Sequence, residues 1–422
     1  MLERFLRRLK HRAEMALLRL QWNRHPEAPM ADASSPVTRL LLIPADPWTL
    51  AGSRGDEAMM SAVVEQLRRR VPAMEVGVVT ATPAAAREAR RLGYVPVCAW
   101  SAWPMRTNRR IDEFKPDAMA VFGADVMDGY YNPVFTTRVL LTADRAARSG
   151  VRVTIIGFSF NDSPSAGLRP VFDGLSRAIA VHVRDQVSLD RFREFSTLPA
   201  TLVADAAFML TPDASTDTFR SVREWAGRRR AAGDAVLGFN IHPMLVAGAS
   251  RQQVDRLIAN SVAALRAVAG KRRSSFLLIP HDYRGASGDA ACLAQIHDLL
   301  APSLDERVML VAGRHSAAQL KAISGLVDGL VTGRMHLAIA ALGMGRPVAA
   351  LTYQDKFHGL FDHFNLPRRF LLDPEALLME GRLEGLMLEF LDSLPELERR
   401  VVHRVGFVNE AALRNLRALG AG

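Results

Sequence analysis

Cysteine is almost absent from this chain of 422 residues, in which only Cys98 and Cys292 occur. Two cysteines cannot build a disulfide framework or a cluster of zinc-binding thiolates, which excludes a disulfide-stabilised secreted scaffold. The chain also lacks any apolar run of the roughly 18 residues that a membrane-spanning helix needs. We therefore expect a protein of the reducing cytoplasm.

Aromatic residues are few, and basic residues are in excess. Aromatic side chains make up 7% of the sequence, and no segment interleaves them with lysine and arginine, so we expect no nucleic acid as a partner. Lysine and arginine total 54 against 44 acidic residues, a net charge of +10. This excess indicates an anionic partner such as a phosphate, an acidic polysaccharide or a membrane surface.

Residues 1–30 place leucine and phenylalanine at helical spacing, with arginine and lysine between them. They lack the unbroken apolar stretch and the small-residue cleavage site of a signal peptide. Two interpretations remain open: a helix that lies on an anionic membrane face, and a helix docked on its own protein. The first would make the protein peripheral at the inner face of the membrane.

Apolar runs typical of strands buried on both faces alternate with helical segments from Thr38 onward. This alternation predicts parallel α/β sheets joined by right-handed crossovers. The first set of strands is expected at 38–45, 74–82, 116–125, 152–160, 178–185 and 200–208. The second set is expected at 235–243, 274–282, 307–314, 326–333 and 347–353, followed by helices at about 374–393 and 395–418.

A polar stretch rich in turn-forming residues separates the two sets of strands. The expected fold class is therefore α/β, with two Rossmann-like domains that carry parallel sheets and face each other across a cleft, the arrangement called GT-B. The expected parts are a basic amphipathic N-terminal extension at 1–37, an N-terminal Rossmann-like domain at 38–210, a linker at 211–234, a C-terminal Rossmann-like domain with the main candidate site at 235–394, and a C-terminal helix at 395–422.

Ligands of such sheets bind beyond the carboxyl ends of the strands, so the residues that follow each strand are candidates. After the first strand, Gly52 and Gly55 let the chain approach a ligand closely, and Asp56 begins a helix. The spacing is not that of a dinucleotide fingerprint, and an ordinary strand-to-helix turn is the alternative. Another strand ends at Gly123, followed by Asp125, where small residues either admit a ligand or solve a tight turn.

Arginine and histidine follow three further strands. Arg184 can present a planar fork to a phosphate or carboxylate, while Asp185 is expected to cap the next helix. His242 and His281 follow consecutive strands of the second set. A single histidine at a strand end is usually a structural hydrogen-bonding group, but two on one rim suggest a site.

The segment Leu330–Tyr353 is the strongest candidate. Its pattern predicts a buried strand, a turn, a very apolar helix and another buried strand. The helix after Gly333 offers free N–H groups and the positive end of its dipole to an anion. Arg334 adds a fixed cation, and His336 adds a group that exchanges protons near neutral pH. We expect both side chains to lie outside the core; the alternative is a surface arginine and a capping histidine.

The chain resembles the polysaccharide pyruvyl transferase family from about residue 39 to residue 375. The resemblance is carried, in order, by GSRGDEA, AVFGAD, VRDQVS, VADAAF and VTGRMHLAIAALGMGRPVAALTYQDKFHGLF. The last stretch is the specific one. It joins Arg-x-His at the start of a small-residue helix to a Gly-x-Pro-Val turn and to a Tyr-x-x-Lys that ends at Lys356.

The resemblance implies a GT-B-like enzyme that transfers the enolpyruvyl skeleton of phosphoenolpyruvate to hydroxyls of a sugar or lipid-linked glycan. The product is a pyruvate ketal, phosphate is released, and no metal or cofactor is implied. Arg184 and Arg334 would hold the donor together with Gly333 and Lys356, and His336 would be the acid/base. The cleft loops would contain Gly52, Gly55, Asp56, Gly123, Asp125, His242 and His281.

Two departures from the family pattern leave other functions open. Ala124 stands where a longer glycine run is common, and Ser53-Arg54 replaces the asparagine often found ahead of Gly-Asp. A GT-B glycosyltransferase using a nucleotide sugar would need an acidic residue for the ribose, for which Asp355 is the candidate. A catalytically silent scaffold of polysaccharide assembly would not need the arginine and histidine pair.

Overall fold

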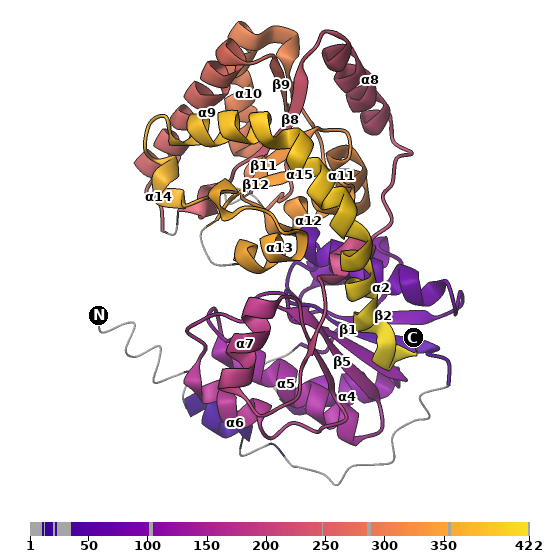
Figure 1. Ribbon diagram of the computed structural model, residues 1–422. Coiled ribbons are helices and arrows are strands. Elements are labelled where there is room, and N and C mark those ends of the chain that lie inside the picture. The colour runs from indigo at the N-terminus through magenta and orange to yellow at the C-terminus, as the bar shows by residue number, and fades with distance from the viewer. Residues whose placement is uncertain are drawn as a thin grey trace. The chain divides into compact units, whose positions relative to one another are not determined.

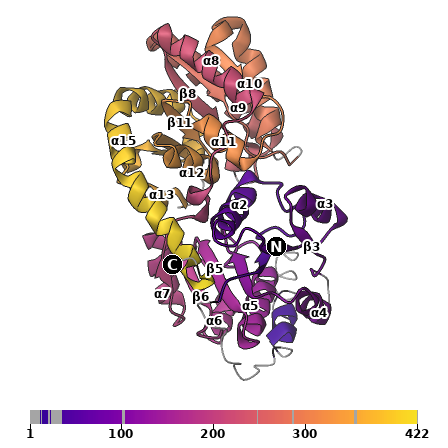
Figure 2. The same ribbon diagram turned by 90° about the vertical axis from the view of Figure 1, so that its right-hand side faces the viewer.

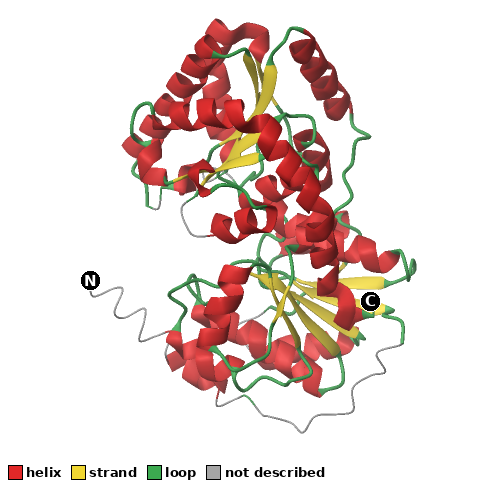
Figure 3. Cartoon of the chain, in the orientation of Figure 1, coloured by secondary structure: helices red, strands yellow, loops and turns green. Residues whose placement is uncertain are grey.

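The computed structural model describes residues 11, 13–19, 22, 35–100, 104–246, 248–284, 288–352 and 356–420. The chain divides into two compact units. The N-terminal unit comprises Met1–Ala51, Met59–Met209 and Glu410–Gly422, and the C-terminal unit comprises Gly52–Ala58 and Leu210–Asn409. Each unit contains one parallel sheet with helices packed on it (Figure 1, Figure 3). The predicted α/β class with two Rossmann-like parallel sheets is therefore confirmed.

The N-terminal sheet has seven strands in the order β3-β2-β1-β4-β5-β6-β7, all parallel. The run predicted at 200–208 forms a strand of only two residues, followed by a 3-10 helix at Ala206–Met209. The strand at 95–97 was not predicted, because three residues are too few for a periodic signal. The strands are β1 (Arg39–Ile43), β2 (Glu75–Val79), β3 (Val95–Val97), β4 (Ala118–Phe122), β5 (Arg152–Phe158), β6 (Ala180–Val183) and β7 (Thr201–Leu202).

Helices of the N-terminal unit begin where side-chain caps allow. Thr82, Asn132 and Asp185 each accept a hydrogen bond from a backbone N–H of the first turn, so the expected cap at Asp185 is confirmed. α5 and α6 lie side by side (Figure 2). The helices are α3 (Pro83–Arg91), α4 (Pro104–Phe114), α5 (Pro133–Arg148), α6 (Arg169–Phe172) and α7 (Gln186–Phe195), together with most of α2 (Arg54–Arg68).

The C-terminal sheet has six parallel strands in the order β10-β9-β8-β11-β12-β13. They are β8 (Ala235–Asn240), β9 (Ser274–Leu278), β10 (Val308–Leu310), β11 (Gly329–Thr332), β12 (Val348–Leu351) and β13 (Leu371–Leu372). α9 packs beside α10, and α11 packs against both α8 and α12. The helices are α8 (Asp217–Ala231), which lies within the stretch expected as a linker, α9 (Arg251–Lys271), α10 (Asp289–Leu304), α11 (Ala317–Ser324), α12 (Met335–Gly343), α13 (Lys356–Phe364) and α14 (Pro374–Leu377), together with most of α15 (Arg382–Leu413).

Both sheets reverse their strand order at one point. In the N-terminal sheet the reversal lies between β1 and β4, and in the C-terminal sheet it lies between β8 and β11. The crossover helices on the two sides of such a point leave in opposite directions, so a crevice opens beyond the carboxyl ends of these two strands. Each unit therefore has a defined position at which a ligand site is expected.

The end of the chain differs from the prediction of two helices near 374–393 and 395–418. α14 is a single short turn, and α15 continues through Pro395 to Leu413. A proline inside a helix removes one hydrogen bond and costs about 3 kcal/mol. The helix continues because its apolar face is buried on both sides of the proline, for example at Phe390 and Leu397.

The described residues of the N-terminal extension contact the N-terminal unit. Residues 13–19 are helical, and Met15 is buried. Arg19 donates a hydrogen bond to the carbonyl of Gly167, and the indole N–H of Trp22 donates to Asp144 at 2.8 Å. These contacts support the docked interpretation for this part, while most of the predicted extension at 1–37 lies outside the described residues. Within the described part of the chain, no helix is both long and apolar enough to cross a membrane.

Candidate functional site

The carboxyl ends of β8 and β11, at the reversal of the C-terminal sheet, are joined by polar side chains. Asn240 is the last residue of β8, and its side chain is fully buried. It accepts a hydrogen bond from Oγ1 of Thr332, the last residue of β11, at 3.2 Å. Its Nδ2 donates to the carbonyl of Ile279 at 2.9 Å and to Oδ2 of Asp289 at 2.6 Å. Three strand ends are thereby fixed relative to one another.

Asp289, the first residue of α10, is the centre of this network. Its carboxylate is fully buried. Besides Asn240, it accepts hydrogen bonds from the backbone N–H groups of His281 and Asp282, each at 3.0 Å. It also accepts a hydrogen bond from Nη2 of Arg334 at 3.0 Å. A buried charge needs such partners, since an unpaired carboxylate away from water is very costly.

Arg334 is held by two carboxylates. Its Nη1 lies 3.3 Å from Oδ2 of Asp282, and its Nη2 pairs with Asp289. The side chain of Arg334 is 13% exposed, and both of its acidic partners are buried. The expectation that this arginine lies outside the core is therefore wrong. Its removal would leave two buried carboxylates without their cation, which typically destabilises a protein by about 3–5 kcal/mol.

α12 begins directly after Arg334, which occupies the N-cap position without forming a side-chain cap. Residues 337–342 of the helix are buried, as its apolar sequence predicts. The N–H groups of a first turn have no partner within the helix, and they lie at the positive end of its dipole. The N-terminus of α12 is thus suited to an anion, and His336 is the second residue of this turn.

The imidazole of His336 lies on the backbone of Gly55. A Cβ atom at residue 55 would be 2.2 Å from Nδ1 of His336 and 2.7 Å from its Cγ. A side chain at residue 55 therefore fits only if the imidazole leaves this position. The sequence suggested that Gly55 lets the chain approach a ligand, whereas the structure shows that it lets the chain approach the histidine.

The segment Gly52–Ala58 belongs to the C-terminal unit although it lies far from it in sequence. Ser53 forms an antiparallel bridge with Asp282. Arg54 is buried, pairs with Glu57 and lies over the ring of Tyr283 at 5.1 Å. Glu57 in turn accepts a hydrogen bond from the backbone N–H of Ala317 at 3.1 Å. These contacts hold Gly55 in place against His336.

His242 and His281 are buried beside the same cluster. Burial lowers the pKa of His242 to about 3, with a further contribution from the charge of Arg334. The Nε2 atom of His242 lies 3.3 Å from the carbonyl oxygen of Gly333. Burial likewise lowers the pKa of His281 well below its usual value, and the charges of His336 and Arg334 act in the same direction. The structure thus brings both predicted histidines to the site as neutral, buried groups.

The pKa values of the two acidic residues of the cluster shift in opposite directions. Burial raises the pKa of Asp289, and the charge of Arg334 and the hydrogen bond from Asn240 only partly oppose it. Burial also disfavours ionisation of Asp282, but the hydrogen bond from Arg284 and the charge of Arg334 outweigh it and lower the pKa. Burial therefore dominates at Asp289, whereas hydrogen bonding and the charge of Arg334 dominate at Asp282.

Several residues of this network were not predicted from the sequence, namely Asn240, Asp282, Asp289, Arg54 and Glu57. Asp282 directly follows His281 and Asn240 stands two residues before His242, so their position at strand ends was a usable signal. Asp289 lies at a helix start, where an acidic residue is common for other reasons. Among the described residues, no three His, Cys, Asp or Glu side chains lie close enough together to hold a metal ion.

The remaining predicted residues lie elsewhere. Arg184 belongs to the N-terminal unit, where it is buried, pairs with Asp205 at 2.9 Å and donates to Ser159 at 2.7 Å. A Cβ at Gly123 would lie 2.6 Å from the Cβ of Phe158, so tight packing against β5 requires this glycine.

Asp125 accepts a hydrogen bond from the hydroxyl of Tyr131 at 3.4 Å. Gly52 precedes α2, Asp56 lies in its first turn, and Lys356 is the first residue of α13. Asp355, considered above for a ribose, lies outside the described residues.

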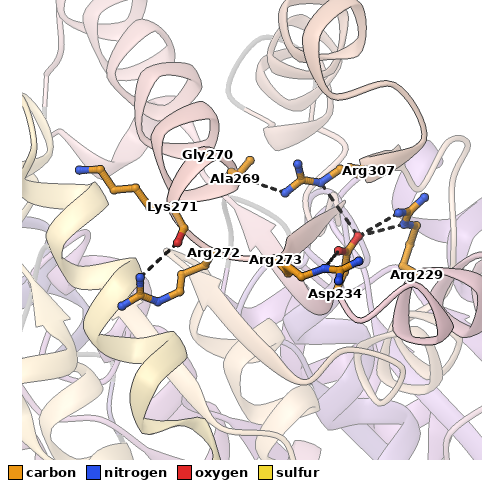
Figure 4. A pocket seen from close by; sticks show the side chains of 8 residues that line it. All are labelled: Arg229, Asp234, Ala269, Gly270, Lys271, Arg272, Arg273 and Arg307. Carbon is orange, nitrogen blue, oxygen red and sulfur yellow. Dashed lines mark hydrogen bonds and ion pairs between the residues drawn. The ribbon is translucent and has the colours of Figure 1, made fainter.

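A basic pocket of about 350 Å³ lies at the amino ends of β8, β9 and β10, at the opposite edge of the C-terminal sheet from the cluster described above (Figure 4). Its side chains are engaged with the protein itself. Arg229 donates to Asp234 at 3.1 and 3.0 Å, and Arg307 donates to the carbonyls of Ala269 and Ser274. Arg272 pairs with Asp392. Arg307 thus binds carbonyls at a helix end and a strand start, while Arg229 and Arg272 are paired with carboxylates, so the pocket is a structural feature.

Comparisons with known proteins agree with this geometry. A model of the polysaccharide pyruvyl transferase family matches residues 54–355. No curated protein matches the sequence. The structure is similar to a putative UDP-N-acetylglucosamine 2-epimerase from Listeria monocytogenes, with a TM-score of 0.56, 14% identity, and coverage of 90% of this chain and 95% of that one.

Two further solved structures share the fold. A UDP-GlcNAc 2-epimerase from Neisseria meningitidis bound to UDP-GlcNAc has a TM-score of 0.55 and 13% identity, covering 89% of this chain and 97% of that one. A glycosyltransferase from Rickettsia africae has a TM-score of 0.51 and 9% identity, covering 90% and 97%. At these identities the likeness concerns the fold alone, and it confirms the GT-B-like class.

The buried histidines predict a pH dependence of stability. The folded state keeps His242 neutral down to a pKa of about 3, whereas the unfolded chain protonates it near 6.5. As the pH falls through this interval the unfolded state binds more protons, so the free energy of unfolding falls by about 1.4 kcal/mol per pH unit for each such histidine. We expect His242→Asn to reduce the pH dependence of the free energy of unfolding by about 1.4 kcal/mol per pH unit, which corresponds to one proton. Urea unfolding between pH about 7 and about 5 measures this dependence. The exposed control His403→Asn should keep the slope of the parent; an unchanged slope in His242→Asn would contradict the assignment.

Proposed function

We propose, because the chain belongs to the polysaccharide pyruvyl transferase family, that it transfers the enolpyruvyl group of phosphoenolpyruvate to two hydroxyls of a sugar. The product is a pyruvate ketal on a polysaccharide or its precursor, and the leaving group is phosphate. One observation carries the proposal: Arg334, His336 and the uncapped N-terminus of α12 meet at the reversal of the C-terminal sheet.

The charges of this site suit the donor. Phosphoenolpyruvate carries a phosphate and a carboxylate, and both are negative at neutral pH. The first turn of α12 supplies N–H groups and the positive end of a dipole, to which a phosphate or carboxylate binds well. Arg334 supplies a positive charge whose position is fixed by Asp282 and Asp289. A fixed cation needs no rearrangement as charge develops during the reaction.

The reaction requires one proton on carbon and one on phosphate. In our proposal His336 donates a proton to the methylene carbon of phosphoenolpyruvate, which becomes a methyl group and leaves the adjacent carbon electrophilic. A sugar hydroxyl adds to that carbon, the C–O bond to phosphate breaks, and the second hydroxyl closes the ketal. Of the two hydroxyl protons, one replaces the proton given by His336 and the other leaves with phosphate. The reaction of donor and acceptor is thus balanced in atoms and charge without an external oxidant or reductant.

The surroundings of His336 support its role as the acid. His242 and His281 have strongly lowered pKa values because they are buried, so neither is a proton donor near neutral pH. His336 is only half-buried and lies in the first turn of α12. In this proposal the other ligands are a free or lipid-linked glycan as acceptor, and the enzyme works in the cytoplasm or at the inner membrane face without a metal or cofactor. Arg184 and Lys356 remain proposed donor contacts.

Substitutions of Arg334 and His336 are expected to impair different steps, donor binding for Arg334 and turnover for His336. His336→Ala should bind phosphoenolpyruvate like the parent but lose turnover by a factor of about 10² to 10⁴, the usual contribution of a positioned acid. Arg334→Lys keeps the charge for the buried carboxylates but loses the planar fork, so donor affinity should fall about tenfold or more. Calorimetry with phosphoenolpyruvate and a phosphate-release assay with sugar acceptors measure the two effects.

Two results would contradict this division of roles. Near-normal turnover of His336→Ala would remove the histidine from the mechanism. Undiminished donor affinity of Arg334→Lys, in a protein with the parent's melting temperature, would place the donor away from the arginine. His403→Ala serves as the matched control, because His403 is an exposed histidine in the same unit.

Gly55→Ala tests the position of the histidine. The added methyl group would overlap the imidazole of His336, which must move away because the backbone is fixed. We expect the turnover number to fall at least about tenfold while the free energy of unfolding changes little, since an imidazole at the edge of a site can rotate. The control is Gly385→Ala in α15, where a methyl group meets nothing within 4 Å. Equal turnover numbers of Gly55→Ala and Gly385→Ala would show that the contact between Gly55 and His336 does not affect turnover.

A further inference from the structure

The loops that follow β1 and β4 flank the reversal of the N-terminal sheet, where a ligand site is expected for this topology. Both loops expose large aromatic side chains. Trp48 is 45% exposed, Tyr130 is 57% exposed and Tyr131 is 52% exposed. β1 and β4 are hydrogen-bonded neighbours with Ile43 opposite Val121, so the two loops leave the sheet side by side.

The aromatic rings are braced by the protein beneath them. The ring of Trp48 lies 5.5 Å from that of Phe135, which is in the first turn of α5. Tyr130 and Tyr131 meet edge to face at 5.3 Å and lead directly into the cap of α5. The hydroxyl of Tyr131 donates to Asp125 at 3.4 Å. These rings are therefore held in place although their outer faces are open to solvent.

The charge of these loops is unlike that of the chain as a whole. The sequence has a net charge of +10, yet residues 44–53 and 123–132 contain no lysine or arginine. They contain three aspartates instead, Asp46, Asp125 and Asp128. Arg138, which follows in α5, lies over the ring of Trp100 at 4.5 Å. An anionic ligand would be repelled here, whereas carboxylate and hydroxyl oxygens can accept hydrogen bonds from a neutral polyhydroxy ligand.

Each of the two loops also holds a strained residue. Leu50 has a φ of 64° and Ala124 a φ of 43°, and both side chains are buried. A non-glycine residue in this region costs on the order of 1–3 kcal/mol and persists only where the surrounding packing imposes it. The two loops are thus fixed in shape at some expense in stability, which is typical of ligand sites.

We propose that Trp48, Tyr130 and Tyr131 form the surface on which a neutral sugar ring of the acceptor stacks. The C–H groups on one face of a pyranose are apolar and pack on aromatic rings, which present a large apolar area with little loss of conformational freedom. The hydroxyls at the ring edge reach Asp46 and Asp125, which are partly exposed, whereas Asp128 is buried. The inference rests on the proposed function for the identity of the ligand as an acceptor, but it concerns residues of the N-terminal unit only.

The test uses three neutral disaccharides, lactose, cellobiose and β-1,4-mannobiose, whose terminal sugars offer free 4- and 6-hydroxyls. Saturation-transfer NMR with irradiation of aromatic protons gives the dissociation constant of each sugar for the parent, Trp48→Ala, Trp48→Phe and the control Phe407→Ala. Phe407 is 56% exposed on α15 and belongs to the C-terminal unit. Calorimetry with phosphoenolpyruvate is run on the same four proteins.

We expect at least one sugar to bind the parent, with affinity about tenfold weaker in Trp48→Ala. Trp48→Phe should recover most of this loss, and Phe407→Ala should match the parent. Phosphoenolpyruvate affinity should be the same in all four proteins. The proposal is overturned if no sugar binds the parent, or if Trp48→Ala binds the sugars as well as the parent does. It is also overturned if Trp48→Ala abolishes a self-association of the parent and leaves sugar binding unchanged. Sugar binding that depends on Trp48 in a protein that does not bind phosphoenolpyruvate would support this site and refute the proposed donor.

Discussion

The pairing of Arg334 with the buried carboxylate of Asp289 is the interaction on which the C-terminal site depends. Asp289 also accepts hydrogen bonds from Asn240 and from the backbone after β9, so one carboxylate connects the ends of β8 and β9, the start of α10 and the start of α12. Arg334 cannot be removed without a large cost, because Asp282 and Asp289 would both be left buried without their cation. This requirement explains why an arginine lies at the N-terminus of the very apolar helix α12.

The same arrangement fixes the geometry that the proposed catalysis needs. An arginine that already has two carboxylate partners does not move when a ligand arrives, and α12 cannot turn because its residues 337–342 are buried. His336 is positioned from the other side by Gly55, in a segment that Ser53 and Glu57 tie to the C-terminal unit. The site is therefore preformed, and ordering it on binding costs little conformational entropy.

The sequence predicted the fold and identified Arg334 and His336 as candidates, but it did not show how these side chains are held. Buried parallel strands are continuous apolar runs, so most were found, while β3 and β13 are too short to give a signal. Arg334 and His336 were found because they interrupt an apolar pattern. Asp289 was missed because its side-chain partners, Arg334 and Asn240, are 45 and 49 residues away in sequence, and no local pattern records such hydrogen bonds. For the same reason Gly55 was assigned to a ligand rather than to the histidine it contacts.

The central claim is that phosphoenolpyruvate is the donor and that its methylene carbon is protonated at the N-terminus of α12. Turnover in heavy water with a neutral sugar acceptor tests this most directly, by mass spectrometry of the product together with phosphate release. The account predicts one phosphate released per ketal formed and one deuterium in the methyl group of each pyruvyl unit. Release of a nucleoside diphosphate from a nucleotide sugar, with phosphoenolpyruvate left unconsumed, would contradict it.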